Sequence, residues 1–312
     1  MRIVVAGFGV QGRKRKFFAG DDCVAVVDPV HPDADFRSLQ DVPTDRYDAV
    51  LACIPDAPKS ELLGYCIANG KHVLVEKPLW VERDEDIVRL EQEARARGVV
   101  VYTAYNHRFE PHYVAMRDLI ASGELGKIYS CRMFYGNGTA RLVRDSVWRD
   151  HGAGVVPDLA SHLLDTCRFW FGDIADDFSV VSARAFENRA PDHAVIASER
   201  GKMRIELEMT LLMWRNHFTC DILAEKGTAH IQSLCKWGPT TFSHRTRVLP
   251  SGRPPEDNET LEQPDPTWAL EYRHFADLCA RKVPADLSED LWLHRALGRL
   301  GKEAVELAER VR

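Results

Sequence analysis

The chain has 312 residues, a formal net charge of -6 and a charged fraction of 28%. Its length favours two domains over one simple core, and its acidic balance excludes the basic footprint of a nucleic-acid-binding protein, so small molecules are the expected partners. The eight cysteines form no CxxC pair and no apolar stretch is long enough to span a bilayer, which predicts a cytoplasmic protein with reduced thiols and no membrane partner.

The first predicted element is a strand over residues 2–6 that breaks into closely spaced glycines and continues as a helix. Such a turn presents backbone N–H groups and the positive end of a helix dipole to a diphosphate. Gly7 permits the tight turn, Gly9 lets the backbone approach a pyrophosphate, and Gly12 lets the helix press against the strand. The predicted dinucleotide contacts are Gly7, Phe8, Gly9, Val10, Gln11 and Gly12.

A second predicted strand, residues 23–27, ends on Asp28, about 20 residues after the first glycine, where this kind of fold places an acid on the ribose. A carboxylate accepts hydrogen bonds from a ribose 2′-OH and repels a 2′-phosphate, so NAD is favoured over NADP. One alternative is that Asp28 is only a turn residue before Pro29. The basic residues 13–16 could meet an extra phosphate, although a solvated helix face is the simpler interpretation.

Strands and helices then alternate, which predicts a parallel sheet. Residues 1–122 are therefore predicted to form a Rossmann domain, a doubly wound parallel sheet of the α/β class. Its remaining strands are expected over residues 47–54, 72–75 and 99–103, and its helices over residues 57–69, 82–97 and 111–122.

After residue 122 the pattern changes to strands that follow one another with short turns, and neighbours joined that closely should pair antiparallel. Residues 123–312 are predicted to form an α+β domain with an open, mostly antiparallel sheet. Its strands are expected over residues 127–135, 178–186, 202–211, 217–223 and 228–232, and its helices over residues 156–171, 268–281 and 289–310.

Residues 233–266 contain six prolines and show little periodicity, which predicts a long connection. A connection of this length in a compact protein usually has a function. It would line a substrate site or embrace a second subunit, and the alternative is a plain surface excursion.

Two segments carry candidate catalytic groups. Lys77, in Glu76-Lys77-Pro78, follows the fourth strand, and ligands of open α/β sheets lie beyond the carboxyl ends of the strands. A lysine there can hydrogen-bond a hydroxyl under oxidation and offset the charge that develops on its oxygen. The alternative is a surface lysine in a loop.

The second segment is the helix over residues 156–171, which places Asp158, His162 and Asp165 on one stripe. An imidazole beside a carboxylate can remove a proton from an alcohol as a hydride leaves its carbon. An ordinary helix pair is the alternative. A metal held by Asp158, His162 and His151 is disfavoured, because no HExxH or Cys/His cluster supports it.

Positive charge is frequent between the first strand of the second domain and this helix, in a loop that should overhang the active site. Arginine there favours a substrate with a phosphate or carboxylate group, such as a nucleotide-linked sugar. The alternative is pairing with the acids Asp145, Asp150 and Glu256. Expected substrate contacts are Arg141, Trp148 and Arg149, and further positive charge lies at Arg144, Lys236, Arg245, Arg247 and Arg253.

These motifs together resemble the Gfo/Idh/MocA oxidoreductases. The resemblance implies a tightly held NAD or NADP and association into dimers or tetramers through the open face of the C-terminal sheet. By motif match, Lys77 resembles the catalytic lysine of that family, His162 its proton-transfer residue and Asp158 the acid that assists it. The matching segments are Gly7 to Gly12, Glu76-Lys77-Pro78, Asn106-His107-Arg108-Phe109, Ile120 to Gly126 and Gly152 to Asp165, and the further implied cofactor contacts are Pro55, Glu76, Pro78 and Asn106.

The chain departs from the family pattern at three places. Ala153 and Ala160 stand where the family has glycine, and Pro55-Asp56-Ala57-Pro58-Lys59 replaces Pro-Asn-x-x-His. These changes bear on cofactor and ligand contacts and leave the expected fold intact.

The sequence therefore predicts an NAD(P)-dependent dehydrogenase that moves a hydride between nicotinamide and a secondary hydroxyl or ketone of a sugar, nucleotide sugar or cyclic polyol. In this mechanism His162 takes the hydroxyl proton, Asp158 supports it and Lys77 holds the reacting oxygen. Two alternatives stay open: a non-catalytic NAD- and sugar-binding regulator or sensor of the same fold, and an enzyme that reduces an imine or enone with NADPH.

Overall fold

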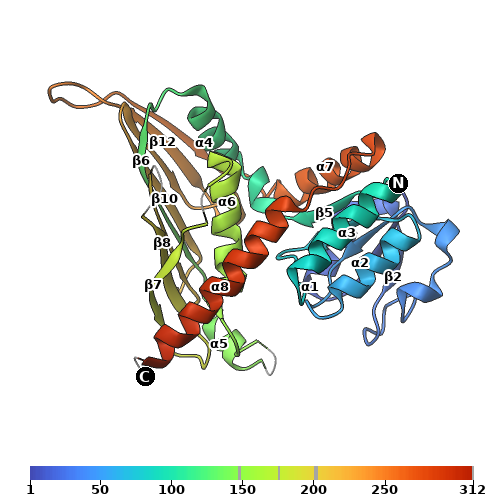
Figure 1. The fold of residues 1–312 in the computed structure, drawn as a ribbon. Coiled ribbons are helices and arrows are strands. Elements are labelled where there is room, and N and C mark those ends of the chain that lie inside the picture. The colour runs from blue at the N-terminus through green and yellow to red at the C-terminus, as the bar shows by residue number, and fades with distance from the viewer. Residues whose placement is uncertain (147–148, 175, 200–202, 311–312) are drawn as a thin grey trace. The chain divides into compact units, whose positions relative to one another are not determined.

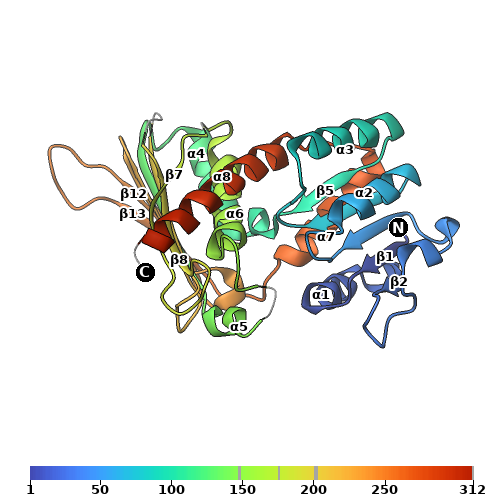
Figure 2. The ribbon, with the colours of Figure 1, turned by 60° about the horizontal axis from the view of Figure 1, so that its bottom comes forward.

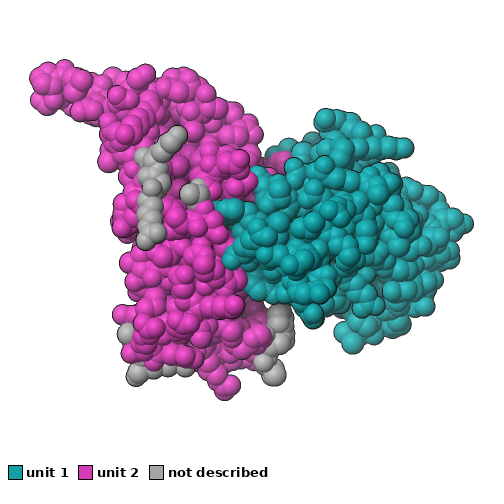
Figure 3. All heavy atoms as spheres, in the orientation of Figure 1, with its two compact units in different colours: residues 1–106, 267–295 teal, residues 107–266, 296–312 magenta. Residues whose placement is uncertain are grey.

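The computed structural model describes residues 1–146, 149–174, 176–199 and 203–310, and its internal contacts divide the chain into two units (Figure 3). Unit 1 comprises Met1–Asn106 with Thr267–Arg295, and unit 2 comprises His107–Pro266 with Ala296–Arg312. This division differs from the predicted one at residue 122. The helix Pro111–Ser122 packs in unit 2, while the helix Thr267–Arg281 packs in unit 1.

Unit 1 contains a five-stranded parallel sheet with the order β2-β1-β3-β4-β5 (Figure 1). Its strands are almost entirely apolar, as expected where helices cover both faces of a parallel sheet. The predicted Rossmann fold is confirmed. The strands are β1 (Ile3–Ala6), β2 (Cys23–Val27), β3 (Ala49–Ala52), β4 (His72–Glu76) and β5 (Val101–Ala104), and the crossover helices are α1 (Val10–Ala19), α2 (Lys59–Ala68) and α3 (Asp84–Arg97).

Alternate residues of β1 enter the cores on the two faces of this sheet. Val4 and Ala6 pack in one core with apolar residues of α2 and α3. Ile3 and Val5 pack in the other, where α7 (Thr267–Arg281) contributes Tyr272, Phe275 and Cys279. A segment near the end of the chain therefore completes the first domain.

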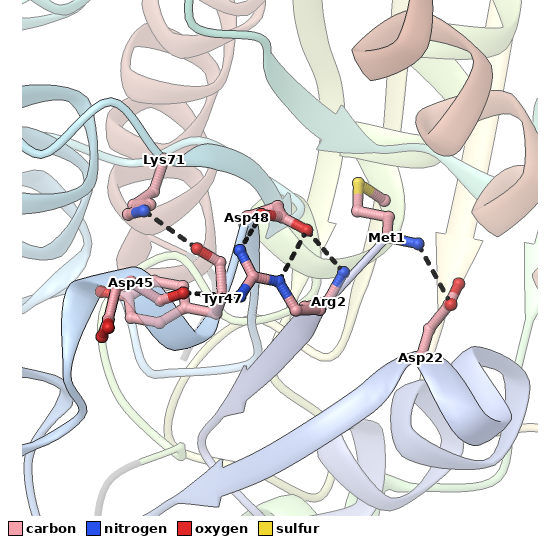
Figure 4. Close-up of polar contacts among 7 residues, drawn as sticks. All are labelled: Met1, Arg2, Asp22, Asp45, Tyr47, Asp48 and Lys71. Carbon is pink, nitrogen blue, oxygen red and sulfur yellow. Dashed lines mark hydrogen bonds and ion pairs between the residues drawn. The ribbon is translucent and has the colours of Figure 1, made fainter.

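Polar contacts hold the edge of this sheet at the amino end of β1 (Figure 4). The Arg2 guanidinium donates to Asp48 Oδ1 at 2.7 Å, and the Arg2 backbone N–H donates to Asp48 Oδ2 at 2.8 Å. These bonds hold the pKa of Asp48 at about 2. The opposite edge, where the strands end, carries the predicted cofactor residues.

Unit 2 contains an eight-stranded sheet with the order β13-β12-β11-β10-β6-β9-β8-β7. Six of its pairings are antiparallel and one, β6 with β9, is parallel, so the prediction of a mostly antiparallel sheet is confirmed. The expected pairing of β9 with β10 is wrong, because β6 lies between them. The strands are β6 (Ile128–Gly136), β7 (Ser179–Arg184), β8 (His193–Ser198), β9 (Arg204–Thr210), β10 (His217–Ala224), β11 (Gly227–Gln232), β12 (Thr240–Thr246) and β13 (Glu256–Leu261).

Within unit 2, helices cover one face of this sheet (Figures 1 and 2). They are α4 (Pro111–Ser122), α6 (Ser161–Phe171) and the later part of α8 (Ser288–Arg310), and the short α5 (Ala140–Arg144) follows β6. In the part of the chain that the structure describes, no helix covers the other face. Near the centre of that face, Arg132 Nε lies 3.1 Å from Glu206 Oε1 and Arg132 Nη2 lies 3.4 Å from Glu208 Oε2.

The expected long connection over residues 233–266 is a β-hairpin, so that prediction is wrong. β12 and β13 extend the edge of the sheet beside β11. All six prolines lie outside the two strands, in the segments before, between and after them, as expected because proline cannot donate to a strand ladder. The strands between these prolines show no alternation in burial, and β13 is almost entirely exposed, so the sequence carried no periodic signal for them.

None of the helices in the described residues has the length and hydropathy of a membrane span. All eight cysteines are free thiols, six of them buried.

The close approach at Gly12 gives a test of the first turn. A Cβ at Gly12 would lie 1.9 Å from the carbonyl oxygen of Gly7, so Gly12→Ala should destabilise unit 1 by about 2 kcal/mol through overpacking. A Cβ at Gly64, inside α2, meets no atom within 4 Å. Gly64→Ala should therefore stabilise by up to about 1 kcal/mol. Urea unfolding measures the change in the free energy of unfolding for each variant. Equal midpoints for Gly12→Ala and Gly64→Ala would contradict the close approach at Gly12.

Candidate active site

The glycine turn after β1 has the geometry that its sequence predicts. Gly7 has a φ of +88°, and a Cβ there would lie 2.3 Å from the carbonyl oxygen of Cys53. Gly9 is the N-cap of α1, makes no side-chain cap, and has open space around the position of a Cβ. The first turn of α1 therefore offers its backbone N–H groups to an anion at close range.

Asp28 fastens this turn to the end of β2. Its Oδ2 accepts from the backbone N–H of Phe8 at 2.7 Å, and its Oδ1 accepts from those of Val30 and His31 at 2.9 and 2.8 Å. Burial would raise the pKa of Asp28, but these backbone donors outweigh it and lower the pKa. The residue is thus both a turn residue and a fixed anion, with acceptor capacity left for a ribose hydroxyl.

Arg15 corrects the interpretation of residues 13–16 as a solvated face. Arg13, Lys14 and Lys16 are exposed, but Arg15 is 2% exposed. Its guanidinium donates to Glu76 Oε1 and to Glu271 Oε2, both at 2.7 Å. A buried guanidinium is tolerated because two carboxylates neutralise it and accept its hydrogen bonds. Glu76, a predicted cofactor residue, therefore has its side chain engaged with Arg15.

The loop that carries Lys77 is held by a buried lysine that the sequence analysis noted only as a departure. Lys59 Nζ donates to the carbonyl oxygens of Glu76 and Pro78, at 2.8 and 2.7 Å, and lies 2.7 Å from Asp56 Oδ1. Burial lowers the pKa of Lys59, and Asp56 opposes this effect. The two carbonyls flank Lys77, so Asp56 and Lys59 fix the backbone on both sides of it.

The predicted cofactor residues of unit 1 gather at one edge of its sheet. Gly7, Pro55 and Lys77 follow the carboxyl ends of β1, β3 and β4, and parallel strands place those ends together. Asn106 follows β5, and its Nδ2 donates to Thr267 Oγ1 at 2.8 Å. The strand order reverses between β1 and β3, which is where such sheets bind dinucleotides.

Unit 2 contains the other two predicted catalytic residues. The expected single helix begins as a π-helical turn, Val156–Ala160, and continues as α6. Asp158 lies in the π turn and His162 in the first turn of α6, and both are half-buried. Single π turns are frequent at functional sites because they re-aim side chains. Lys77 belongs to unit 1 and this pair to unit 2.

Asp165, the third residue of the predicted stripe, has a structural partner. It is 1% exposed and accepts from Arg108 Nε at 3.1 Å and from Arg108 Nη2 at 2.5 Å. This ion pair fixes the Asn106–Phe109 turn against α6. It explains why His107, next to Arg108, meets the helix that carries His162.

His107 and Lys236 are neighbours of His162 that sequence reasoning missed. The rings of His107 and His162 stack with centroids 4.0 Å apart and planes 19° apart. Lys236 Nζ lies 3.0 Å from His107 Nε2, 3.4 Å from the Tyr135 hydroxyl and 4.7 Å from the centre of the Trp237 ring. The available signals were the motif around His107 and the positive charge of Lys236, but nothing in the sequence joined them.

The structure does not bring together the expected substrate contacts between β6 and α6 that it describes, Arg141 and Arg149. Arg141 is 72% exposed and lies 3.8 Å from Glu187, while Arg149 is half-buried. Trp148 lies outside the described residues. The alternative of acid pairing holds for two other basic residues, because Arg144 pairs with Asp145 at 3.3 Å and Arg245 with Glu256 at 2.7 Å.

Asp150 is placed differently from the alternative in which it pairs with an arginine side chain, and the sequence already disfavours the metal alternative. Asp150 accepts from the backbone N–H groups of Arg189 and Ala190 rather than from an arginine side chain. Among the described residues, the metal-competent group consists of Glu110, Cys235 and Asp265, and it includes neither Asp158 nor His162.

Two regions of the chain match known protein families. Residues 1–105 match an oxidoreductase family with an NAD-binding Rossmann fold, and residues 113–230 match the GFO/IDH/MocA C-terminal domain. The inositol 2-dehydrogenase of Mycolicibacterium smegmatis is 29% identical over 242 residues, covering 74% of this chain and 64% of that protein. The scyllo-inositol 2-dehydrogenase (NADP(+)) IolW of Bacillus subtilis is 25% identical over 232 residues, covering 73% of this chain and 62% of that protein.

A solved structure shares the fold. GenD2 from gentamicin A biosynthesis, crystallised with NAD, gives a TM-score of 0.77 at 20% identity, covering 98% of this chain and 94% of that one. The chain spans less than two-thirds of the length of these curated relatives. The two family models match residues 1–105 and 113–230 in that order, and the chain belongs to the Gfo/Idh/MocA family of oxidoreductases.

Proposed function

We propose that this protein is an NAD(P)-dependent dehydrogenase that moves a hydride between nicotinamide and a secondary hydroxyl or ketone of a cyclic polyol, sugar or nucleotide sugar. The observation that carries the proposal is the presence, in one chain, of a dinucleotide turn, a fixed lysine loop and an Asp158–His162 pair. Relatives named as inositol dehydrogenases support the substrate class.

The residues of unit 1 fit a dinucleotide. The uncapped start of α1 at Gly9 suits a diphosphate, and the open space at Gly9 is a cradle that a Cβ would fill. Asp28 presents a fixed carboxylate to a ribose. When bound, the nicotinamide supplies the carbon that accepts the hydride.

The chain's own groups manage the hydroxyl. As the hydride leaves the substrate carbon, the O–H proton passes to His162 and the C–O bond becomes a carbonyl. Asp158 stabilises the imidazolium that forms. Lys77 donates a hydrogen bond to the reacting oxygen, and the bonds from Lys59 to the carbonyls beside it hold that amine in place.

Asp28 favours NAD over NADP, because an anion at this position repels a 2′-phosphate. Two arginines of unit 2, Arg141 and Arg149, support a substrate with a negatively charged group. The eight free thiols support a reducing cytoplasmic location.

The catalytic assignment is tested with Lys77→Met and His162→Asn. Each should lower kcat by at least about a hundredfold while NAD affinity changes less than about threefold. Reduced nicotinamide is followed by absorbance with a panel of inositols, sugars, sugar acids and nucleotide sugars. The exposed Lys302→Met and His217→Asn are matched controls. Undiminished turnover in Lys77→Met and His162→Asn would refute the assignment. If the wild-type protein binds NAD but turns over no substrate of the panel, the alternative of a non-catalytic sensor is favoured.

Cofactor choice is tested with Asp28→Ser. Loss of a charged hydrogen-bond acceptor should weaken NAD binding by about tenfold and should improve NADP relative to NAD. Asp21→Ser, at an exposed acid of the same region, is the control. Calorimetric titration with both cofactors gives the ratio, and an unchanged ratio would mean that Asp28 serves only the turn.

We also propose that copies of the chain associate through the uncovered face of the eight-stranded sheet. Leu223 points to that face between the buried Ile222 and Ala224 and is 51% exposed. Leu223→Arg should shift a dimer or tetramer toward the monomer in analytical ultracentrifugation, because it buries an unpaired charge at the contact. Leu142→Arg, at a 68% exposed leucine of α5, should leave the assembly unchanged. A monomeric wild-type protein would exclude this interface.

A further inference from the structure

His107 lies at the meeting point of four elements in unit 2. It is 1% exposed, stacks on His162 of α6, and receives Lys236 from the turn before β12. Tyr113 of α4 and Tyr135 of β6 present their rings at 6.0 and 5.7 Å. The hydride-transfer mechanism above uses His162 and gives no role to His107 or Lys236.

A charged ammonium group at Lys236 restricts the protonation state of the His107 imidazole, because Lys236 Nζ lies 3.0 Å from Nε2. An ammonium group has three donors and no acceptor, so Nε2 of His107 accepts and its proton resides on Nδ1. A doubly protonated His107 would lose this acceptor and place a second positive charge 3.0 Å from the ammonium. A charged Lys236 therefore excludes a charged His107.

Carboxylates near Lys236 oppose the effect of its burial. Burial lowers the pKa of Lys236, and the negative charges of Glu110, Asp265 and Asp158 offset part of this effect. Cys235 lies beside Glu110, and its raised pKa keeps the thiol neutral. Carboxylates from three places therefore face the lysine: Glu110 at the N-cap of α4, Asp265 before α7 and Asp158 in the π turn.

The consequence reaches His162 through the stacked rings. An imidazolium at His162 is tolerated over a neutral imidazole face, whereas two imidazolium rings with centroids 4.0 Å apart would repel strongly. If His107 could also titrate, the two rings would share their protons as a coupled pair and His162 would lose its identity as a single base.

We propose that Lys236 is a positioning residue that holds His107 in its neutral Nδ1–H form, so that His162 accepts the substrate proton as an isolated base. This inference rests on the proposed dehydrogenase function only where it predicts an effect of Lys236 on kcat. The state of His107 itself is a property of the folded protein and can be measured without turnover.

The direct test is nuclear magnetic resonance of histidine nitrogens in the full chain, with His107→Phe used to assign the signals. In the wild type, His107 should show an Nδ1–H tautomer that does not titrate between about pH 5 and 8, whereas in Lys236→Met it should titrate. Lys236→Arg, which keeps a charged donor, should preserve the wild-type behaviour. A wild-type His107 that titrates in this range would overturn the proposal.

The kinetic test is a double-mutant cycle. Lys236→Met should lower kcat by about tenfold when His107 is present, but by less than about twofold in a His107→Phe background, where the neighbouring ring cannot take a proton. The acid limb of kcat/KM should report two coupled groups in Lys236→Met and one group in the double variant. The exposed Lys226→Met is the control for loss of a lysine.

The remaining outcomes separate the two proposals. If Lys236→Met lowers kcat equally with His107 present and in the His107→Phe background, Lys236 is a general structural residue. If it raises KM equally in the two backgrounds, Lys236 is a substrate contact. Either result overturns the inference. Circular dichroism and urea midpoints confirm folding, and Lys236→Gln, which also removes the charge, replaces Lys236→Met if the latter unfolds. If no substrate is turned over, the dehydrogenase proposal fails while the nitrogen spectra still decide the state of His107.

Discussion

A buried cation organises the first unit. Arg15 lies on the helix that follows the glycine turn, and its two partners come from the end of β4 and from α7. One guanidinium thus joins the dinucleotide turn, the Lys77 loop and the segment that completes the sheet. Because an uncompensated charge at 2% exposure is very costly, the three segments must be assembled together. The geometry of the cofactor edge depends on this constraint.

Each unit fixes the surroundings of a predicted catalytic residue by burying polar groups in pairs. Lys59 bonds two carbonyls around Lys77 in unit 1, as Lys236 bonds His107 beside His162 in unit 2. In both cases a buried lysine bonds a neighbouring group. Burial lowers the pKa of each lysine, and nearby carboxylates oppose this effect, Asp56 in one unit and Glu110 in the other.

Local pattern was enough to predict the Rossmann strands, the glycine turn and the helix with His162, since each depends on neighbours in sequence. The burial of Arg15 was not predictable, because Glu271 is 256 residues away. The insertion of β6 between β9 and β10 and the His107–Lys236 contact also depend on distant pairing. Composition misled at residues 233–266, where the prolines lie outside the strands and neither strand alternates in burial.

The place of α7 has a consequence for synthesis. The core on one face of the first sheet contains Ile3, Val5 and Leu51 and is completed by Tyr272 and Phe275 of α7. Those aromatic residues leave the ribosome after nearly all of unit 2, so residues 1–106 cannot complete this core as they emerge. Part of the apolar face therefore lacks its cover through most of translation.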